Sequence, residues 1–114
     1  MLSKQYRANP AEIVLAREEG KLFPGPLFSL LIFNLNDNRF SCFAFIVSSK
    51  IAKKAVKRNR LKRTLRDIVF NLLSETKKGK IILFLAKKKI LDRDIKTLGK
   101  EVREMYMKAG VVSK

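Results

Sequence analysis

Two mostly apolar runs, residues 28–35 and 40–47, predict two β-strands. The Asn-Asp-Asn sequence at 36–38 favours a tight turn between them, so the expected pairing is an antiparallel hairpin. Both runs are apolar at odd and even positions alike, whereas a strand with one face in water alternates apolar and polar residues. Both faces of this sheet are therefore expected to be covered at least in part, unless one face offers an apolar surface to a ligand.

A third apolar run, residues 81–86, is short and continuous, which is typical of a strand in the interior of a sheet. A very short additional strand is expected near Leu22 and Phe23. Residues 1–8 are a polar lead-in that is expected to be loosely ordered. No internal repeat or linker divides the chain, so its 114 residues are expected to form one domain.

Helical signals stand before and after these strands. Asn9 can cap a short helix in which Pro10 takes the first position, and Gly20 suits its end. Residues 92–110 predict a last helix that ends at Gly110. Its apolar stripe has helical spacing and consists of Ile95, Leu98, Val102, Met105 and Tyr106.

The remaining helix is expected between Lys54 and Ser74 and is strongly basic. On a helical wheel one stripe is apolar and consists of Leu61, Leu65, Ile68, Val69 and Leu72. The opposite side carries Asn59, Arg60, Arg63, Arg66 and Asp67. Lys62 lies at the boundary, where its long stem can reach outward. Arg58 falls near the apolar stripe, so either the stripe has ended there or Arg58 reaches around the first turn.

The whole chain is basic, with 26 Lys and Arg against 10 Asp and Glu and a formal net charge of +16. An excess of that size calls for a polyanionic partner, with nucleic acid as the first candidate and an anionic membrane as the second. The apolar stretch at 27–35 is too short to span a bilayer, and the first residues lack the apolar run of a secretory signal. Together with the single cysteine, Cys42, these features favour a protein of the reducing cytoplasm.

Protein-borne catalysis finds little support in the residues. The chain has no histidine, the commonest general base at neutral pH. No carboxylate motif is visible, and Asp92 and Asp94 are better placed to begin the last helix, where acids complement the helix dipole. Cys42 alone cannot form a zinc cluster and is expected to be a small core residue. We therefore expect no catalytic residue and no metal site in this chain.

The basic helix is suited to phosphate. Its first turn combines free backbone N–H groups and a positive dipole end with cations that are unfavourable there unless an anion is bound. On the residues alone, two alternatives stay open. The cations can be an ordinary solvated helix face, or the helix can read DNA, although nothing shows the rest of a helix-turn-helix.

The order of residues within "AVKRNRLKRTLRD", residues 55–67, resembles the arginine-rich signature of the bacterial ribonuclease P protein component. The residues that carry the resemblance are Arg58, Asn59, Arg60, Leu61, Lys62, Arg63, Arg66 and Asp67. A strand ending in "VSSK" precedes the signature and "KGKIILFLAKK" follows it, and the likeness extends from residue 6 to residue 110.

The resemblance implies an α/β sandwich with a small mixed four-stranded sheet in the order α-β-β-β-α-β-α. It implies a left-handed crossover through the basic helix, although nearly all such crossovers are right-handed. It also implies a ribonucleoprotein whose RNA is the catalyst and removes the 5′ leader of precursor tRNA, with Mg²⁺ bound through the RNA; neither DNA nor a membrane is an expected partner. The residues expected to bind the catalytic RNA are Lys54, Lys57, Arg58, Asn59, Arg60, Lys62, Arg63 and Arg66.

In the family, the first helix and the sheet form a cleft for the single-stranded leader, usually with aromatic residues on that helix. The first helix of this chain offers none, so Ile13, Leu31 and Phe33 are the candidates for leader contacts, and residues of this kind are more often plain core. Phe45 and Lys53 stand where the family often has glycine. Lys50, Lys53, Lys87 and Lys88 are candidates for extra phosphate contacts, and the alternative for Lys87 and Lys88 is an ordinary solvated strand end.

A structural RNA-binding protein, such as a ribosomal one, is the main alternative, and a protein-only nuclease is a third. All three readings explain the charge of the chain. They differ in what the purified protein does on its own.

Overall fold

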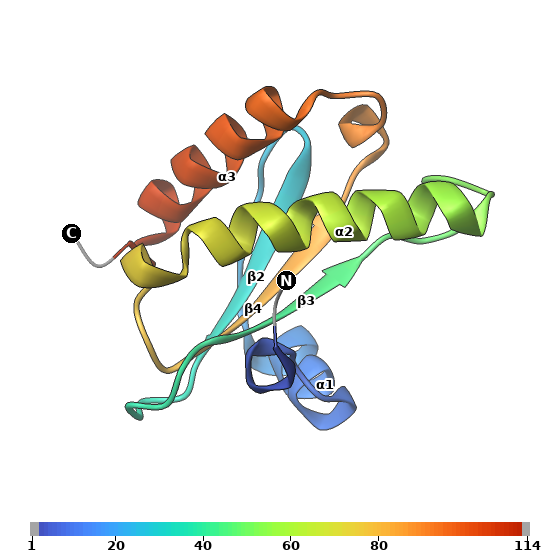
Figure 1. The fold of residues 1–114 in the computed structure, drawn as a ribbon. Coiled ribbons are helices and arrows are strands. Elements are labelled where there is room, and N and C mark those ends of the chain that lie inside the picture. The colour runs from blue at the N-terminus through green and yellow to red at the C-terminus, as the bar shows by residue number, and fades with distance from the viewer. Residues whose placement is uncertain (1–2, 113–114) are drawn as a thin grey trace.

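A four-stranded sheet carries helices on both of its faces in this computed structural model, which describes residues 3–112 (Figure 1). The elements follow the order expected from the sequence. The helices are α1 (Pro10–Glu19), α2 (Ala55–Asn71) and α3 (Ile95–Ala109), and the strands are β1 (Lys21–Phe23), β2 (Phe28–Asn34), β3 (Cys42–Ile46) and β4 (Lys80–Ala86). Short 3-10 turns are η1 (Lys4–Tyr6), η2 (Leu73–Glu75) and η3 (Lys88–Ile90).

The expected hairpin between β2 and β3 is wrong, because β4 lies between these two strands. The sheet order is β1-β2-β4-β3, with β2 antiparallel and β3 parallel to β4. The loop from β2 to β3 straddles the start of β4: the N–H of Leu35 donates to the carbonyl of Gly79, and the N–H of Gly79 donates to that of Arg39. Gly79 has a φ of 77°, and a Cβ there would lie 2.4 Å from the carbonyl oxygen of Asp37.

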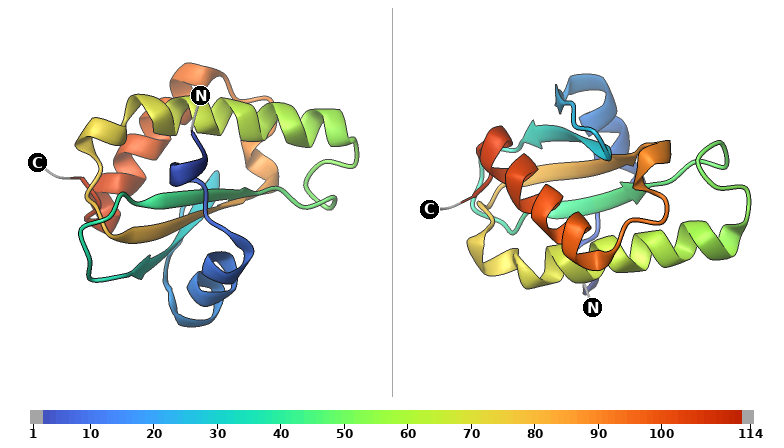
Figure 2. Two further views of the ribbon diagram at one scale, coloured as in Figure 1. Left: turned by 60° about the horizontal axis from the view of Figure 1, so that its bottom comes forward. Right: turned by 90° about the horizontal axis from the view of Figure 1, so that it is seen from above.

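The crossover from β3 through α2 to β4 is left-handed. In Figure 1, α2 lies in front of the sheet, both parallel strands point to the upper right, and the chain passes from β3 to β4 on its left. Figure 2 shows the same layering from two other sides, with α2 and α3 on one face and α1 on the other. The handedness thus agrees with the family resemblance and departs from the usual rule for parallel strands.

Strand β4 explains why its sequence is continuously apolar. Its side chains alternate between the two faces, and both faces are covered. Ile82 and Phe84 belong to the core under α2 and α3, whereas Ile81 and Leu83 belong to the core under α1. All four are fully buried, so the prediction of an interior strand is confirmed.

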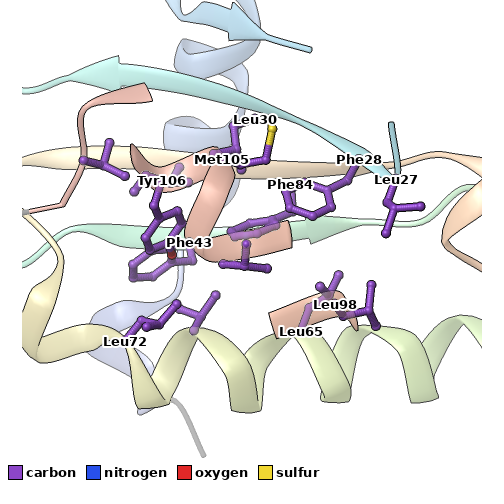
Figure 3. Packing of buried hydrophobic residues seen from close by; sticks show 14 of the residues in the cluster. Leu27, Phe28, Leu30, Phe43, Leu65, Leu72, Phe84, Leu98, Met105 and Tyr106 are labelled. Atoms are coloured by element: carbon purple, nitrogen blue, oxygen red, sulfur yellow. The ribbon is translucent and has the colours of Figure 1, made fainter. Parts of the chain in front are cut away.

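The larger core fills the space between the sheet and the helices α2 and α3. Figure 3 shows Leu65 from α2 and Leu98 and Tyr106 from α3 converging on aromatic side chains of the sheet. The rings of Phe28 and Phe84 lie 5.2 Å apart, centroid to centroid. This core holds α2 in place by its apolar stripe.

Local signals set the helix ends. Asn9 and Glu12 form a capping box, in which each side chain accepts from the other residue's N–H at 2.8 and 2.9 Å. Asp94 caps α3, and Gly110 ends it in the left-handed conformation. One member of the predicted stripe of α3 is misplaced, since Ile95 in its first turn is 62% exposed.

The lead-in before α1 makes more contacts than the expected loose order of residues 1–8 suggests. The N–H of Ala8 donates to the carbonyl of Phe43, and Arg7 forms a β-bridge with Phe43. The ring of Tyr6 lies 5.4 Å from that of Phe40. These contacts attach η1 beside the edge strand β3; residues 1 and 2 lie outside the described part of the chain.

Candidate nucleic-acid interface

Helix α2 is divided lengthwise into an anchoring side and a cationic side, as the helical wheel predicts. Leu65 and Val69 are buried against the sheet, whereas Arg60 and Arg63 are exposed. Lys62 is half-buried at the boundary between the two sides. The packing therefore orients the helix so that its cations face away from the protein.

The first turns of α2 project beyond the sheet (Figures 1 and 2). Val56 in the first turn is 68% exposed, so this end of the helix is open to a partner. Lys54 makes no side-chain cap, and the first turn contains no acid. Lys53, Lys57 and Arg58 add their charges to the positive end of the helix dipole, and this combination favours a bound anion.

The side chain of Arg58 turns back from α2 onto the loop before the helix. Its Nη1 donates to the carbonyl oxygens of Ala52 at 2.8 Å and of Lys53 at 2.7 Å. Of the two alternatives for Arg58, the structure shows the second. The side chain reaches around the first turn, although the wheel places the residue near the apolar stripe. By this contact it holds the loop that carries Lys50 and Lys53, both of which are exposed.

The carboxylates of residues 3–112 form no ion pair with the cations of α2. Within residues 3–112, ion pairs join Arg39 to Glu12 and Asp37, and Arg103 to Glu75. None of them involves a residue of α2. The positive charge of this helix is therefore available to an external polyanion.

The segment that follows η3 lies beside the first half of α2. A pocket of about 200 Å³ separates the two. Lys57 and Arg60 line it from α2, and Asp92 and Arg93 line it from the segment after η3. Lys87, just before η3, and Lys88, its first residue, are exposed, and Nζ of Lys87 donates to the carbonyl of Gly25. Neither Lys87 nor Lys88 lines this pocket, so the extra phosphate contacts expected of them stay a prediction.

Comparisons with known proteins identify this arrangement. The family model described as ribonuclease P matches residues 4–110. The chain belongs to the ribonuclease P protein family. The ribonuclease P protein component of Pseudanabaena is 32% identical over 113 residues, which cover 98% of this chain and 97% of that protein. That of Thermoanaerobacter pseudethanolicus is 36% identical over 81 residues, covering 71% of this chain and 69% of that one.

Solved structures of ribonuclease P proteins share the fold. The protein from Staphylococcus aureus has a TM-score of 0.84 at 22% identity, covering 95% of this chain and 98% of that one. The protein from Thermotoga maritima has a TM-score of 0.78 at 25% identity, covering 87% and 93%. As a ribonuclease P protein, this chain is a subunit of a tRNA-processing endoribonuclease, and its partner is the ribonuclease P RNA. The alternative of a ribosomal protein is not favoured.

The candidates for leader contacts lie together on the α1 face of the sheet. Ile13 comes from α1, and Leu31 and Phe33 come from β2. All three are half-buried and pack against the smaller core. Ala44 and Ile46 of β3 on the same face are also only half-buried. In this member of the ribonuclease P protein family, α1 therefore leaves apolar surface of the sheet partly uncovered.

Acidic residues do not gather into a metal site in the described part of this ribonuclease P protein. No group of three His, Cys, Asp or Glu side chains within residues 3–112 could hold a metal ion. Cys42 is buried beside Glu12, and burial raises the pKa of its thiol to about 11. Over the same residues, no helix is long and apolar enough to cross a membrane.

Sequence reasoning missed one group of residues that could contact RNA. Tyr6, Phe40 and Lys78 are far apart in the sequence, yet they meet at the edge of the sheet next to β3. Tyr6 belongs to the lead-in, and Phe40 begins a predicted strand, whereas β3 begins at Cys42. The β-bridge between Arg7 and Phe43 and the position of β4 bring them together, so no local sequence pattern predicts the group.

Proposed function

We propose that this chain uses the cationic side of α2 to hold the catalytic RNA of ribonuclease P, and that the RNA carries out the cleavage. The observation that carries this proposal is a helix anchored by its apolar stripe whose exposed cations have no carboxylate partner in the described chain. The contacts assigned to the catalytic RNA are those of Lys54, Lys57, Arg58, Asn59, Arg60, Lys62, Arg63 and Arg66. Arginine and lysine side chains bind backbone phosphates and displace counterions.

The Mg²⁺ that serves the hydrolysis is assigned to the RNA. The acids of residues 3–112 offer no cluster to hold it, whereas RNA phosphates supply the oxygen ligands that Mg²⁺ prefers. The protein contributes cations that lower the repulsion between the catalytic RNA and the precursor tRNA. The proposed location of this reaction is the cytoplasm.

The 5′ leader of precursor tRNA is assigned to the α1 face of the sheet. Ile13, Leu31 and Phe33 supply half-buried apolar surface there, against which unpaired bases can pack. Aliphatic packing lacks the stacking energy of an aromatic platform, so the contribution of this face to leader affinity is expected to be modest.

Reconstitution tests the main proposal. Protein alone should leave precursor tRNA intact, and protein with the matching catalytic RNA should cleave it at a Mg²⁺ concentration too low for the RNA alone. Cleavage by protein alone, or unchanged RNA activity after protein is added, would refute the proposal. For the leader, substrates with one and with several leader nucleotides should differ in affinity, and Leu31→Ser should reduce that difference while Met107→Ser, on exposed α3 surface, should not.

The individual cations can be tested by salt dependence. Arg60→Ala and Arg63→Ala should each lower the slope of log K against log salt by roughly 0.7–0.9, the value for one phosphate contact. Both side chains are exposed, so the denaturant midpoint should barely change. A lower midpoint together with an unchanged slope would make them ordinary helix-face residues.

A further inference from the structure

A pocket of about 270 Å³ opens at the edge of the sheet, away from the projecting end of α2. It lies between η1, the start of β3 and the segment that follows α2, and Figure 2 shows η1 beside the edge strand. The side chains that matter for its chemistry are those of Tyr6, Phe40, Ser41, Thr76, Lys77 and Lys78. Neither the cationic side of α2 nor the α1 face of the sheet contributes to it.

Two aromatic rings form one wall of this pocket. The centroids of Tyr6 and Phe40 lie 5.4 Å apart with their planes tilted by 60°. Phe40 is 49% exposed, although a phenylalanine of a folded domain usually buries most of its ring. An exposed ring held by a second ring is the kind of platform on which single-stranded nucleic acid stacks its bases.

Cations stand directly beside the rings. Nζ of Lys78 lies 5.1 Å from the centroid of Phe40, and Lys77 lines the same pocket. A cation over an exposed ring contributes little by itself, so Lys78 can exchange this contact for a phosphate at small cost. The pocket therefore pairs an apolar stacking surface with the charge that a nucleotide backbone needs.

Hydrogen bonds make the rest of the pocket rigid. Oγ of Ser41 donates to the carbonyl of Lys77 at 2.6 Å and accepts from the N–H of Lys80 at 3.1 Å. Oγ1 of Thr76 donates to the carbonyl of Leu72 at 2.7 Å. These bonds fix the turn that carries both lysines against the start of β3, so binding requires little reordering of the chain.

We propose that this aromatic–lysine pocket binds one unpaired nucleotide of RNA, with the base against Phe40 and Tyr6 and a phosphate on Lys77 and Lys78. The inference rests on the proposed function, since it takes RNA as the partner. The charge of the pocket argues against a protein segment of basic or neutral character, and its volume suits a single base. The nucleotide comes either from the catalytic RNA or from the precursor tRNA, because both offer the same chemistry.

Variants of Phe40 test the ring directly. Phe40→Leu keeps apolar volume and removes the aromatic face, whereas Phe40→Trp keeps an aromatic face. Met107→Leu is the control, because Met107 is 70% exposed on α3 and lies outside both the pocket and the cationic side of α2. Two dissociation constants are measured at one salt concentration: protein with catalytic RNA, and assembled enzyme with precursor tRNA.

The expected result is that Phe40→Leu weakens one of the two affinities by about fivefold or more, as loss of one stacked base implies. Phe40→Trp should retain that affinity, and Met107→Leu should match wild type. The affinity that falls identifies the source of the nucleotide. Lys78→Gln, which leaves the core untouched, should lower the salt slope of the same affinity by roughly 0.7–0.9 and serves if Phe40→Leu does not fold.

The proposal is overturned if Phe40→Leu and Lys78→Gln both match wild type in both measurements, or if Phe40→Trp is as weak as Phe40→Leu. Failure of the proposed function has a different signature. In that case the wild-type protein itself neither binds the catalytic RNA nor stimulates it, whereas failure of the pocket leaves wild-type stimulation intact.

Discussion

Replacing Arg58 should separate its contribution to the stability of the fold from its contribution to RNA binding. Its Nη1 donates to two carbonyl oxygens of the loop before α2, at 2.8 and 2.7 Å. A hydrogen bond from a charged donor contributes roughly 1.5–3 kcal/mol, and the side chain is half-buried, so the lower part of that range applies. Sharing one nitrogen between both acceptors reduces the sum further, and Arg58→Ala should cost about 2 kcal/mol of unfolding free energy.

Urea unfolding measures this cost. A slope of roughly 1–3 kcal/mol per molar urea turns 2 kcal/mol into a midpoint lowered by about 1 M. Arg60→Ala is the matched control, because Arg60 stands two residues further along the same helix and is exposed. Its midpoint should stay within the change of about 0.5 kcal/mol that is usual for a surface substitution.

Arg58→Lys tests what the contact does for RNA binding. Lysine keeps the charge but lacks the planar fork that reaches both carbonyls. If Arg58 holds the loop in place, Arg58→Lys should weaken RNA affinity with the salt slope unchanged. Equal urea midpoints for Arg58→Ala and Arg60→Ala would refute the reasoning, because the two carbonyl contacts would then contribute nothing in solution.

Three further substitutions or conditions test the fold. Asn9→Ala should lower the unfolding free energy by about 1 kcal/mol, measured by urea, because it removes the capping box of α1. Tyr106→Phe should leave the thermal midpoint unchanged or raise it, because the buried hydroxyl of Tyr106 makes no hydrogen bond within residues 3–112; a clear fall would contradict this. Burial raises the pKa of Cys42 from 9.0 to about 11, so the folded state holds its proton more tightly and stability should fall as pH rises from 9 to 11. Urea midpoints over that range should show less of this fall in Cys42→Ala.

Local chemistry made the helices predictable from the sequence. Asn9, Asp94 and Gly110 act within one turn of their own position, and each stands where the pattern placed it. The apolar stripe of α2 likewise follows from the helical period alone, since it needs only one partner surface. Leu65 and Val69 are buried on it as expected.

Strand pairing was not predictable in the same way. The turn chemistry at 36–38 favours a hairpin, but β4, about forty residues further along the chain, decides the pairing. The backbone N–H and C=O groups along both edges of β4 need hydrogen-bond partners, and β2 and β3 supply them. The sequence correctly marks β4 as interior without saying which strands flank it. The left-handed crossover has no local signal at all, and only the family resemblance implied it.

The candidate RNA-binding site likewise has one part that the sequence predicts and one part that it does not. The exposed cations of α2 could be read from the wheel, because their direction depends on the helix alone. The double contact of Arg58 depends on how the loop at 48–54 folds back, and the meeting of Tyr6 with Phe40 depends on a bridge between the lead-in and β3. Long-range geometry of this kind leaves no periodic trace in the sequence.

The central place of β4 has a consequence for synthesis on the ribosome. Strands β2 and β3 both pair with β4, so neither can complete its hydrogen bonds before residue 86 has been made. At roughly 5–20 residues per second, the apolar residues of β2 wait for several seconds with an open strand edge. During that interval the nascent chain is most exposed to aggregation through this edge.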